Sequence, residues 1–380
     1  MHCEWNCEGA PIWAGQHRTR TTSSLPITVL LHAIGTLVVH GCESVPVDGV
    51  CDHLRVHVVV VGAGVSGLST ARLLLAGGHE VTLVSGDPLR QTTSHLAAAV
   101  WFPTAAGPAD AVARWSASTY EVLVRAAADG VPGVCMRESL VLYREEADVL
   151  PPLPSWAEAV GEVRLARPDE LPPGYPHGLR FVVPLVEMPT YLPHLYDSVV
   201  HNGAQHVQRR LGALDQVLDL RPDVVVNAAG LTAGALAGDN TTFPVRGQIL
   251  RVVNPGLSLS VRDEHHPGGR AYVHPRTQDC ILGGTLEVGV WDTTPDADET
   301  AAILKRCADI APALAGAQLI ESIVGLRPGR REIRLEVDES LLAVPVVHNY
   351  GHGGSGVTVG WGCAADAAAL VDSLADASNE

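Results

Sequence analysis

At 380 residues the chain is long enough to bury a large core, which excludes a short peptide module and indicates one large domain or two closely joined domains. Acidic residues outnumber basic residues by 42 to 26, and the formal net charge of -16 argues against a phosphate-backbone partner such as nucleic acid. The eight cysteines form no C-x-x-C pair, which favours free thiols in a reducing cytoplasm.

The first fifty residues differ from the rest of the chain. The segment Leu25–Cys42 is apolar, but polar and helix-breaking residues interrupt it, and it is shorter than the roughly 20 residues of a membrane span. Two preceding arginines give it the look of a secretory signal. We interpret residues 1–54 instead as an N-terminal extension that is disordered or lies outside the mature core. The extension contains four cysteines, Cys3, Cys7, Cys42 and Cys51. Their spacing fits no zinc-ligand pattern, so we predict no metal site.

The first regular pattern is a strand, a glycine-rich turn, a helix and a second strand. The valine-rich run Val56–Val61 predicts a fully buried parallel strand. Apolar residues then recur at helical spacing until Gly77 and Gly78 end the helix. The turn has G-x-G-x-x-G spacing, in which a pyrophosphate approaches the helix N terminus, so it predicts dinucleotide binding. It consists of Gly62, Ala63, Gly64, Val65, Ser66 and Gly67.

The later elements divide the chain into two kinds of sheet. A loop-rich, proline-punctuated middle is followed by a buried strand over Asp223–Gly230 and by alternating strands downstream of it. A helix around Ala301–Ala313 and a final helix complete the chain. The order predicts an α/β fold, α+β overall, in which a Rossmann-like domain with a parallel sheet joins a substrate domain with a mainly antiparallel sheet. The nucleotide-binding domain then comprises residues 55–115, 196–244 and 321–380, and the substrate domain residues 116–195 and 245–320.

The turn alone leaves the cofactor open, since FAD and NAD both fit it. An acidic residue that binds the adenosine ribose usually ends the second strand of such a unit. Here Gly86 occupies that place and Asp87 follows it. Either the register slips by one residue or another group holds the ribose.

Five separated motifs, in order and at matching spacing, resemble the family of FAD-dependent D-amino-acid oxidases, in its bacterial type. The resemblance runs from about Val56 to Val371 and covers nearly all of the chain beyond the extension. Its motifs are VVVGAGVSGLSTA, TTSHLAAAVWFP, GGTLEVGVWD, GLRPGRREIRLE and HNYGHGGSGVTVGWGCA.

The resemblance implies that FAD is the cofactor and assigns three segments to it besides the first turn. The resemblance implies that three hydroxyls bind the ribose or phosphates of FAD: those of Thr92, Thr93 and Ser94. Without the resemblance, these residues would be interpreted as an ordinary polar turn. The resemblance also implies that three small residues lie against the flavin ring: Ala98, Ala99 and Val100. Without it, they would be interpreted as a buried strand. A glycine loop under the flavin leads into the last helix, whose positive end faces the ring: Gly351, Gly353, Gly354, Ser355, Gly356, Val357 and Thr358.

The resemblance also implies a substrate clamp. Arg327 binds the substrate carboxylate, which a planar guanidinium does with two charge-assisted bonds. Tyr272, otherwise a core ring, adds a second bond, and the substrate amine faces a backbone carbonyl near Gly354. Three nearby arginines are alternatives to Arg327, each also explicable as a surface ion pair: Arg330, Arg331 and Arg334. The segment that leads to Tyr272, HHPGGRAY, is shorter than in the better-known animal members of the family. This difference predicts a pocket that is more open than theirs.

The function implied is oxidative deamination of D-amino acids, neutral ones preferred, to 2-oxo acids, ammonia and hydrogen peroxide, by hydride transfer from the substrate Cα to flavin N5. One alternative is an oxidase of D-aspartate or D-glutamate, which needs another cation from His274, Arg276 or Arg330. The other is an NAD-linked dehydrogenase. We expect a cytoplasmic protein with a small-molecule substrate and O2 as partners, without nucleic acid or membrane. A homodimer is one candidate assembly, and the sequence leaves the oligomeric state open.

Overall fold

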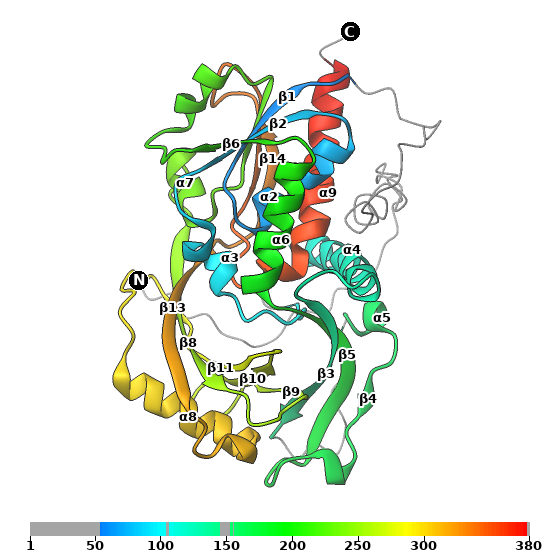
Figure 1. Ribbon diagram of the computed structural model, residues 1–380, viewed down its shortest axis with the longest axis vertical. Helices are drawn as coiled ribbons and strands as arrows, with labels where there is room; N and C mark the ends of the chain where they lie inside the picture. The colour runs from blue at the N-terminus through cyan, green and yellow to red at the C-terminus, as the bar shows by residue number, and fades with distance from the viewer. Residues whose placement is uncertain (1–53, 104–105, 145–152, 155, 378–380) are drawn as a thin grey trace, which may run out of the picture.

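The computed structural model describes residues 54–103, 106–144, 153–154 and 156–377. The structure contains two sheets, which lie one above the other along the long axis of the molecule (Figure 1). The upper sheet in that view has six strands and the lower sheet nine. This arrangement confirms the predicted mixed α/β fold.

The six-stranded sheet carries the dinucleotide turn. Its order is β14 (Arg334–Asp338), β15 (Val346–Tyr350), β7 (Val224–Asn227), β1 (His57–Val61), β2 (Glu80–Ser85) and β6 (Gln205–Gln208). All neighbours pair in parallel except β14, which is antiparallel to β15.

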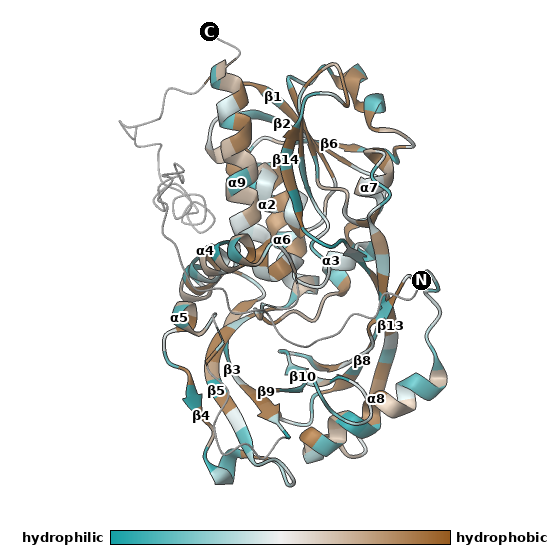
Figure 2. Ribbon diagram, turned by 180° about the vertical axis from the view of Figure 1, so that it is seen from behind, coloured by the Kyte–Doolittle hydropathy of each residue, from teal (hydrophilic) through white to brown (hydrophobic). Residues whose placement is uncertain are grey.

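Both faces of this sheet are covered, because β1 alternates its valines between two cores. Val58 and Val60 pack with residues of α2 (Val65–Ala76) and α9 (Gly356–Ala377), while Val59 and Val61 pack against the 3-10 helix Leu214–Leu220. The middle strands are accordingly largely brown in the hydropathy colouring of Figure 2. A strand buried on both faces is apolar throughout, as the sequence of β1 predicts.

The nine-stranded sheet is mainly antiparallel and belongs to the substrate side. Its order is β12 (Glu287–Val288), β8 (Phe243–Val253), β11 (Asp279–Gly283), β10 (Ala271–Pro275), β9 (Ser260–Asp263), β3 (Val134–Tyr143), β5 (His177–Val186) and β4 (Arg164–Leu165). The long strand β13 (Leu319–Gly329) pairs with β8. Residues 321–329, which the sequence analysis assigned to the third cofactor segment, thus pair with a strand of the nine-stranded sheet, and the domain boundaries stay a prediction.

The remaining helices cover these sheets. They are α3 (Thr93–Leu96), α4 (Ala109–Ala128), α5 (Ala157–Val160), α6 (Met188–His201), α7 (Ala233–Leu236) and α8 (Ala297–Ile310). In Figure 1, α2, α6 and α9 lie along the six-stranded sheet, and α8 lies beneath the nine-stranded one. Among the residues described, no helix is both long and apolar enough to span a membrane.

Candidate active site

The turn that follows β1 is packed so tightly that it excludes side chains. Gly62 has a φ of +116°, and its N–H donates to the carbonyl oxygen of Val84 at 2.8 Å. A Cβ at Gly67 would lie 1.9 Å from the carbonyl oxygen of Gly62. A Cβ at Gly62 would lie 2.3 Å from that of Ala228. Glycine is required at both positions, and α2 consequently lies close against β1 and β7.

The N terminus of α2 has no side-chain cap. Gly64 is the N-cap residue, and the first turn contains no acidic side chain. The N–H of Val65 donates to Ser94 Oγ at 3.0 Å. The positive end of α2 therefore faces the space beyond β1, where it stabilises an anionic group such as a phosphate.

The three hydroxyls of the loop after β2 have different surroundings. Thr92 is the N-cap residue of α3, and its Oγ1 accepts from the N–H of His95 at 3.2 Å. Thr93 Oγ1 donates to the carbonyl oxygen of Leu326 on β13 at 2.9 Å. Ser94 is the hydroxyl that contacts the turn after β1. The assignment of Thr92 and Thr93 to the cofactor stays a prediction, and both hydroxyls already have partners inside the protein.

The small residues at 98–100 form an extended segment beside β5. Ala99 exchanges both backbone hydrogen bonds with Val186, at 2.8 and 3.4 Å, and Val100 forms a bridge with Leu185. Successive residues of an extended chain face opposite sides. The backbone of Ala98 and Val100 therefore faces away from Val186, so pairing with β5 and contact with a bound ring are compatible.

The glycine loop before α9 adopts left-handed backbone conformations. Gly351 has a φ of +85° and Gly353 a φ of +55°, and Gly354 is exposed. The helix itself begins one residue earlier than expected, at Gly356. Thr358 Oγ1 donates to the carbonyl oxygen of Phe102 at 3.2 Å, so this predicted cofactor residue ties α9 to the segment after Val100.

His352 joins the glycine loop to α2. Its Nε2 lies 3.0 Å from Asn349 Oδ1, and its Nδ1 lies 3.4 Å from Ser66 Oγ. Asn349 Nδ2 in turn donates to Thr70 Oγ1 at 3.2 Å. A neutral imidazole with its proton on Nε2 satisfies both contacts, since Ser66 then donates to Nδ1. Burial lowers the pKa of His352 to about 4, which keeps the ring neutral at neutral pH.

The end of β2 departs from the usual ribose-binding arrangement. Asp87 forms an ion pair with Arg210. A Cβ at Gly86 would lie 3.1 Å from the Cα of Arg210, so the segment after β6 covers this strand end. The carboxylate of Asp87 is therefore engaged, which favours the alternative that another group holds the ribose.

These segments fit FAD. Parallel strands β1, β7 and β15 end at one edge of their sheet, which is where ligands of such sheets bind. Helix α9 starts near the middle of the molecule and runs to the C terminus at the top of Figure 1. In the turn Gly62–Gly67, a Cβ at the first or last glycine would overlap backbone atoms, and the first turn of the helix behind it contains no acidic side chain. The residues that would hold the pyrophosphate and the ring are those of this turn, Ser94 and Gly351–Gly354.

Arg327 lies on β13, and its side chain crosses the neighbouring strand β8. A Cβ at Gly247 would lie 2.1 Å from Arg327 Nη1, so the guanidinium rests on a glycine. Nη1 donates to the carbonyl oxygen of Thr285 at 3.1 Å. Within the described ranges no carboxylate pairs with Arg327, and its charge is available for a ligand.

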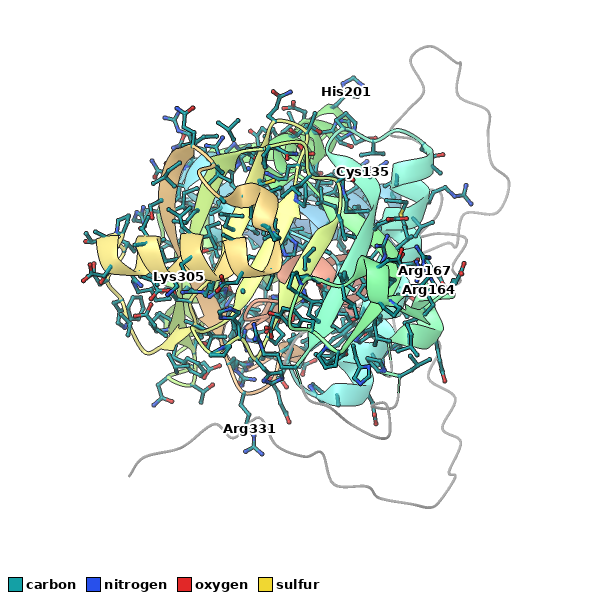
Figure 3. All side chains as sticks on the ribbon, turned by 90° about the horizontal axis from the view of Figure 1, so that it is seen from below. Cys135, Arg164, Arg167, His201, Lys305 and Arg331 are labelled. Atoms are coloured by element: carbon teal, nitrogen blue, oxygen red, sulfur yellow. The ribbon has the colours of Figure 1, made fainter. Side chains whose placement is uncertain are left out.

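The three other arginines of the same region have different partners. Arg330 pairs with Asp239 at 3.0 Å, and Arg334 pairs with Glu336 at 2.7 Å. Arg331 extends from the rim of the molecule into solvent (Figure 3). Arg327 is therefore the arginine of this group that suits a carboxylate ligand.

Tyr272 lies on β10 and approaches Arg327. A Cβ at Gly283 would lie 2.1 Å from Tyr272 Cζ, and one at Gly284 would lie 2.7 Å from the hydroxyl oxygen and 3.0 Å from the carbonyl oxygen of Gln248. The Tyr272 ring therefore lies over Gly283 and Gly284, next to the strand β8 that the Arg327 side chain crosses. Burial raises the pKa of Tyr272, although Arg327 and Arg262 oppose that effect, so the hydroxyl keeps its proton and can donate.

A small cavity next to the strand partner of Tyr272 is lined by a cation that the sequence analysis missed. The cavity is partly open to solvent, and apolar residues such as Val100, Phe102 and Phe181 line most of it. Arg262 of β9 also lines the cavity, opposite Tyr272 in the strand register. Its guanidinium lies 3.9 Å from the centre of the Phe102 ring and 3.6 Å from Glu264 Oε1. The sequence signal for Arg262 was the alternation of apolar and charged residues over 261–263, which read V-R-D just before the shortened segment.

The three cations expected for an acidic substrate are not free. His274 stacks on Tyr272 with ring centres 4.9 Å apart, and burial, then Arg262, lower its pKa well below the usual range. Arg276 binds Asp279 through two bonds of 2.6 and 2.7 Å. Arg330 is paired as described above. Each of the three is neutral or paired with a carboxylate in this structure, and the role of any of them as the extra cation stays a prediction.

The cysteines and histidines of the extension, and the apolar segment Leu25–Cys42, lie outside the described residues. In the part of the chain that the structure describes, no three His, Cys, Asp or Glu side chains gather to hold a metal ion. Four free cysteines are described there, of which three are buried: Cys280, Cys307 and Cys363.

Comparison with known proteins places this geometry among flavin enzymes. A family model described as FAD dependent oxidoreductase matches residues 57–370. A D-amino-acid oxidase of Rubrobacter xylanophilus is 49% identical over 312 residues, 82% of this chain and 94% of the relative. A Streptomyces coelicolor D-amino-acid oxidase is 38% identical over 82% of this chain and 96% of the relative.

A relative with a different named substrate and a solved structure complete the comparison. The human D-aspartate oxidase is 37% identical over 83% of this chain and 94% of the relative. The crystal structure of a glycine oxidase from Geobacillus kaustophilus superposes with a TM-score of 0.70 at 20% identity, covering 86% of this chain and 95% of that one. That structure supports the fold alone.

Proposed function

The chain belongs to the family of FAD dependent oxidoreductases, and on that premise we propose that it oxidises D-amino acids with O2. The D-amino acid becomes a 2-imino acid, which water hydrolyses to a 2-oxo acid and ammonia, while O2 becomes hydrogen peroxide. The observation that carries the proposal is the pair Arg327 and Tyr272: the guanidinium rests on Gly247 of β8, and the tyrosine ring rests on Gly283 of the neighbouring strand β11. An NAD-linked dehydrogenase loses its support, since the family uses FAD.

The carboxylate of the substrate binds first to Arg327, whose charge lacks a carboxylate partner in the described residues. Two parallel charge-assisted bonds from its guanidinium fix the plane of that carboxylate. The Tyr272 hydroxyl, which stays protonated, donates a further bond. With the carboxylate fixed, the substrate can turn only about the bond to its Cα.

The remaining substituents of the Cα are then sorted by the chain. The neutral amine faces a backbone carbonyl near Gly354, and the side chain enters the cavity beside Phe102. Bound FAD would supply the acceptor for the Cα hydrogen and its electron pair, with O2 as the final acceptor of those electrons. The chain contributes position rather than a proton-removing side chain, which is an effect of orientation. An L-amino acid held by the same clamp presents a different substituent, so we expect D-specificity.

The cavity favours neutral side chains. Its lining is mainly apolar, and the face of the Arg262 guanidinium is covered by Phe102. Glu264, at 3.6 Å from Arg262, offsets much of the remaining charge. We therefore propose that small and branched neutral D-amino acids are preferred.

Oxidation of acidic D-amino acids is the second candidate. One specific observation favours it, because Arg262 is a cation at the wall of the cavity. A relative named D-aspartate oxidase is 37% identical to this chain. In this case the side-chain carboxylate of the substrate would take the place of Glu264 as the partner of Arg262.

One experiment separates the two candidates. Hydrogen peroxide formation is measured with D-alanine, D-valine, D-aspartate and their L-enantiomers, for the wild type and for Arg262→Gln. We expect the neutral D-amino acids to be oxidised faster, with that preference kept in the variant. A faster rate on D-aspartate that Arg262→Gln removes selectively would favour the second candidate. The absence of peroxide with every D-amino acid would contradict the proposed function.

A cytoplasmic location and a homodimer are two further parts of the proposal. The scattered free thiols support the first, and the second rests on the family resemblance alone. Size-exclusion chromatography with light scattering and localisation of a tagged chain test them independently of activity.

A further inference from the structure

The peptide carbonyls on either side of Arg327 are both bound by cofactor segments. The Thr93 hydroxyl donates to the carbonyl oxygen of Leu326 at 2.9 Å. The N–H of Gly353 donates to the carbonyl oxygen of Pro328 at 2.8 Å. Thr93 follows β2 and Gly353 follows β15, so two distant parts of the cofactor site meet the substrate strand one residue before and one residue after its clamp.

These contacts lie along the open edge of β13. In the described part of the chain, β8 is the strand partner of β13, and Arg327 pairs with Val245 there. Carbonyls two residues apart on a strand point to the same side. The carbonyls of Leu326 and Pro328 therefore share the edge that β8 does not occupy. The Thr93 hydroxyl and the Gly353 N–H take the place of a neighbouring strand at this edge.

The Thr93 hydroxyl is not needed by its own helix. Thr92 caps α3, as its Oγ1 accepts from the N–H of His95. Thr93 uses its donor hydrogen 233 residues away in the chain, on β13. Close packing supports the same contact, since a Cβ at Gly325 would lie 3.9 Å from Leu96 of α3.

We infer that Thr93 is a positioning residue for the substrate clamp, whose hydroxyl holds β13 so that Arg327 projects over Gly247. This inference rests on the proposed function, in that Arg327 must bind a carboxylate. It differs from the role that family resemblance implied, because the hydroxyl then serves substrate binding and not the cofactor. A carboxylate ligand should accordingly bind more weakly when this one hydrogen bond is removed, while FAD affinity is kept.

The test uses Thr93→Val, which keeps the shape of the side chain and removes the hydroxyl, and Thr93→Ser, which restores the donor. Three quantities are measured on full-length holoprotein: the FAD dissociation constant, the dissociation constant of propanoate from the change in flavin absorbance, and KM and kcat for D-alanine. We expect Thr93→Val to raise the propanoate constant and KM by about fivefold to tenfold, the usual effect of one lost hydrogen bond. The FAD constant should stay within about twofold, and Thr93→Ser should restore propanoate binding.

Other outcomes overturn the inference. A loss of FAD affinity larger than the loss of propanoate affinity would make Thr93 a cofactor ligand. Unchanged constants in Thr93→Val would make its contact with β13 incidental. If Thr93→Val yields no holoprotein, Thr93→Ala carries the same comparison. Propanoate binding is read without turnover, so a wild type that binds propanoate but oxidises no D-amino acid would contradict the proposed function and leave the role of Thr93 measurable.

Discussion

The turn after β1 and the clamp on β13 serve one site, but the first is made of backbone and the second of side chains. At the turn, a Cβ on Gly67 would lie 1.9 Å from a carbonyl oxygen, so packing alone defines the shape. At the clamp, Arg327, Tyr272 and Arg262 come from three strands and are held by hydrogen bonds and stacking. Changes at the turn should therefore affect folding and FAD binding together. Changes at the clamp should affect substrate binding while the holoprotein persists.

The largest effect is expected from Gly67→Val. The new side chain would overlap the carbonyl of Gly62, and neither backbone segment can move without separating α2 from β1. We expect no yellow holoprotein after purification, measured by flavin absorbance. Gly360→Ala is the matched control in α9, since its Cβ would make an ordinary 3.6 Å contact with Val65. That variant should bind FAD normally, and a normal Gly67→Val protein would contradict the described packing.

Arg327→Ala should leave the holoprotein intact and remove most activity. Two charge-assisted bonds are lost, which corresponds to a roughly 10²- to 10³-fold fall in kcat/KM for D-alanine. Steady-state peroxide formation measures it. Arg331→Ala, at a side chain that faces solvent, serves as the control and should behave like the wild type. Normal turnover in Arg327→Ala would show that the carboxylate is bound elsewhere.

His352→Leu should weaken the connection between the two halves of the cofactor site. Its loss leaves Ser66 and Asn349 without their buried partner, so the FAD dissociation constant should rise roughly tenfold. His352→Gln keeps a donor for Asn349 and should retain more of the affinity. Equal FAD binding in His352→Leu and the wild type would contradict the role of this network.

The same histidine predicts how stability depends on pH. The folded-state pKa values of His348 and His352 are both lowered from 6.5 to about 4, chiefly by burial. The unfolded chain therefore takes up protons first as the pH falls, and stability is full above pH 6.5 and decreases towards pH 4. Each histidine contributes roughly 1.4 kcal/mol per pH unit within that window. The free energy of unfolding, measured with urea at pH values between 7 and 5, should depend less steeply on pH in His352→Gln than in the wild type. An equal pH dependence would exclude His352 as a contributor.

Tyr272→Phe should give the smallest effect. The ring still packs on Gly283 and His274, and one hydrogen bond to the carboxylate is lost. KM for D-alanine should rise about threefold to tenfold, with little change in thermal stability. Tyr196→Phe removes a hydroxyl that contacts His206 on another part of the protein, and its KM should be unchanged. A larger loss than in Arg327→Ala would reverse the order of the two clamp residues.

The contrast between the two regions also explains what the sequence predicted. The turn Gly62–Gly67 follows from local spacing, because strand, turn and helix are consecutive. Arg262 was missed, since its place depends on which residue of β9 pairs with Tyr272. The hydrogen bond from Thr93 to Leu326 connects residues that no local pattern relates. Strand β13 was not predicted for a similar reason, since it is defined by its pairing with β8 along its whole length.

For the proposed reaction, FAD and a D-amino acid must meet between the glycine-lined segments and the Arg327 clamp. The direct measurement is the visible spectrum of the purified holoprotein under anaerobic conditions before and after addition of D-alanine or L-alanine. We predict a yellow protein that D-alanine bleaches, that L-alanine leaves unchanged, and that D-alanine bleaches far more slowly in Arg327→Ala. A yellow protein that neither enantiomer bleaches, or that both bleach equally, would contradict the account.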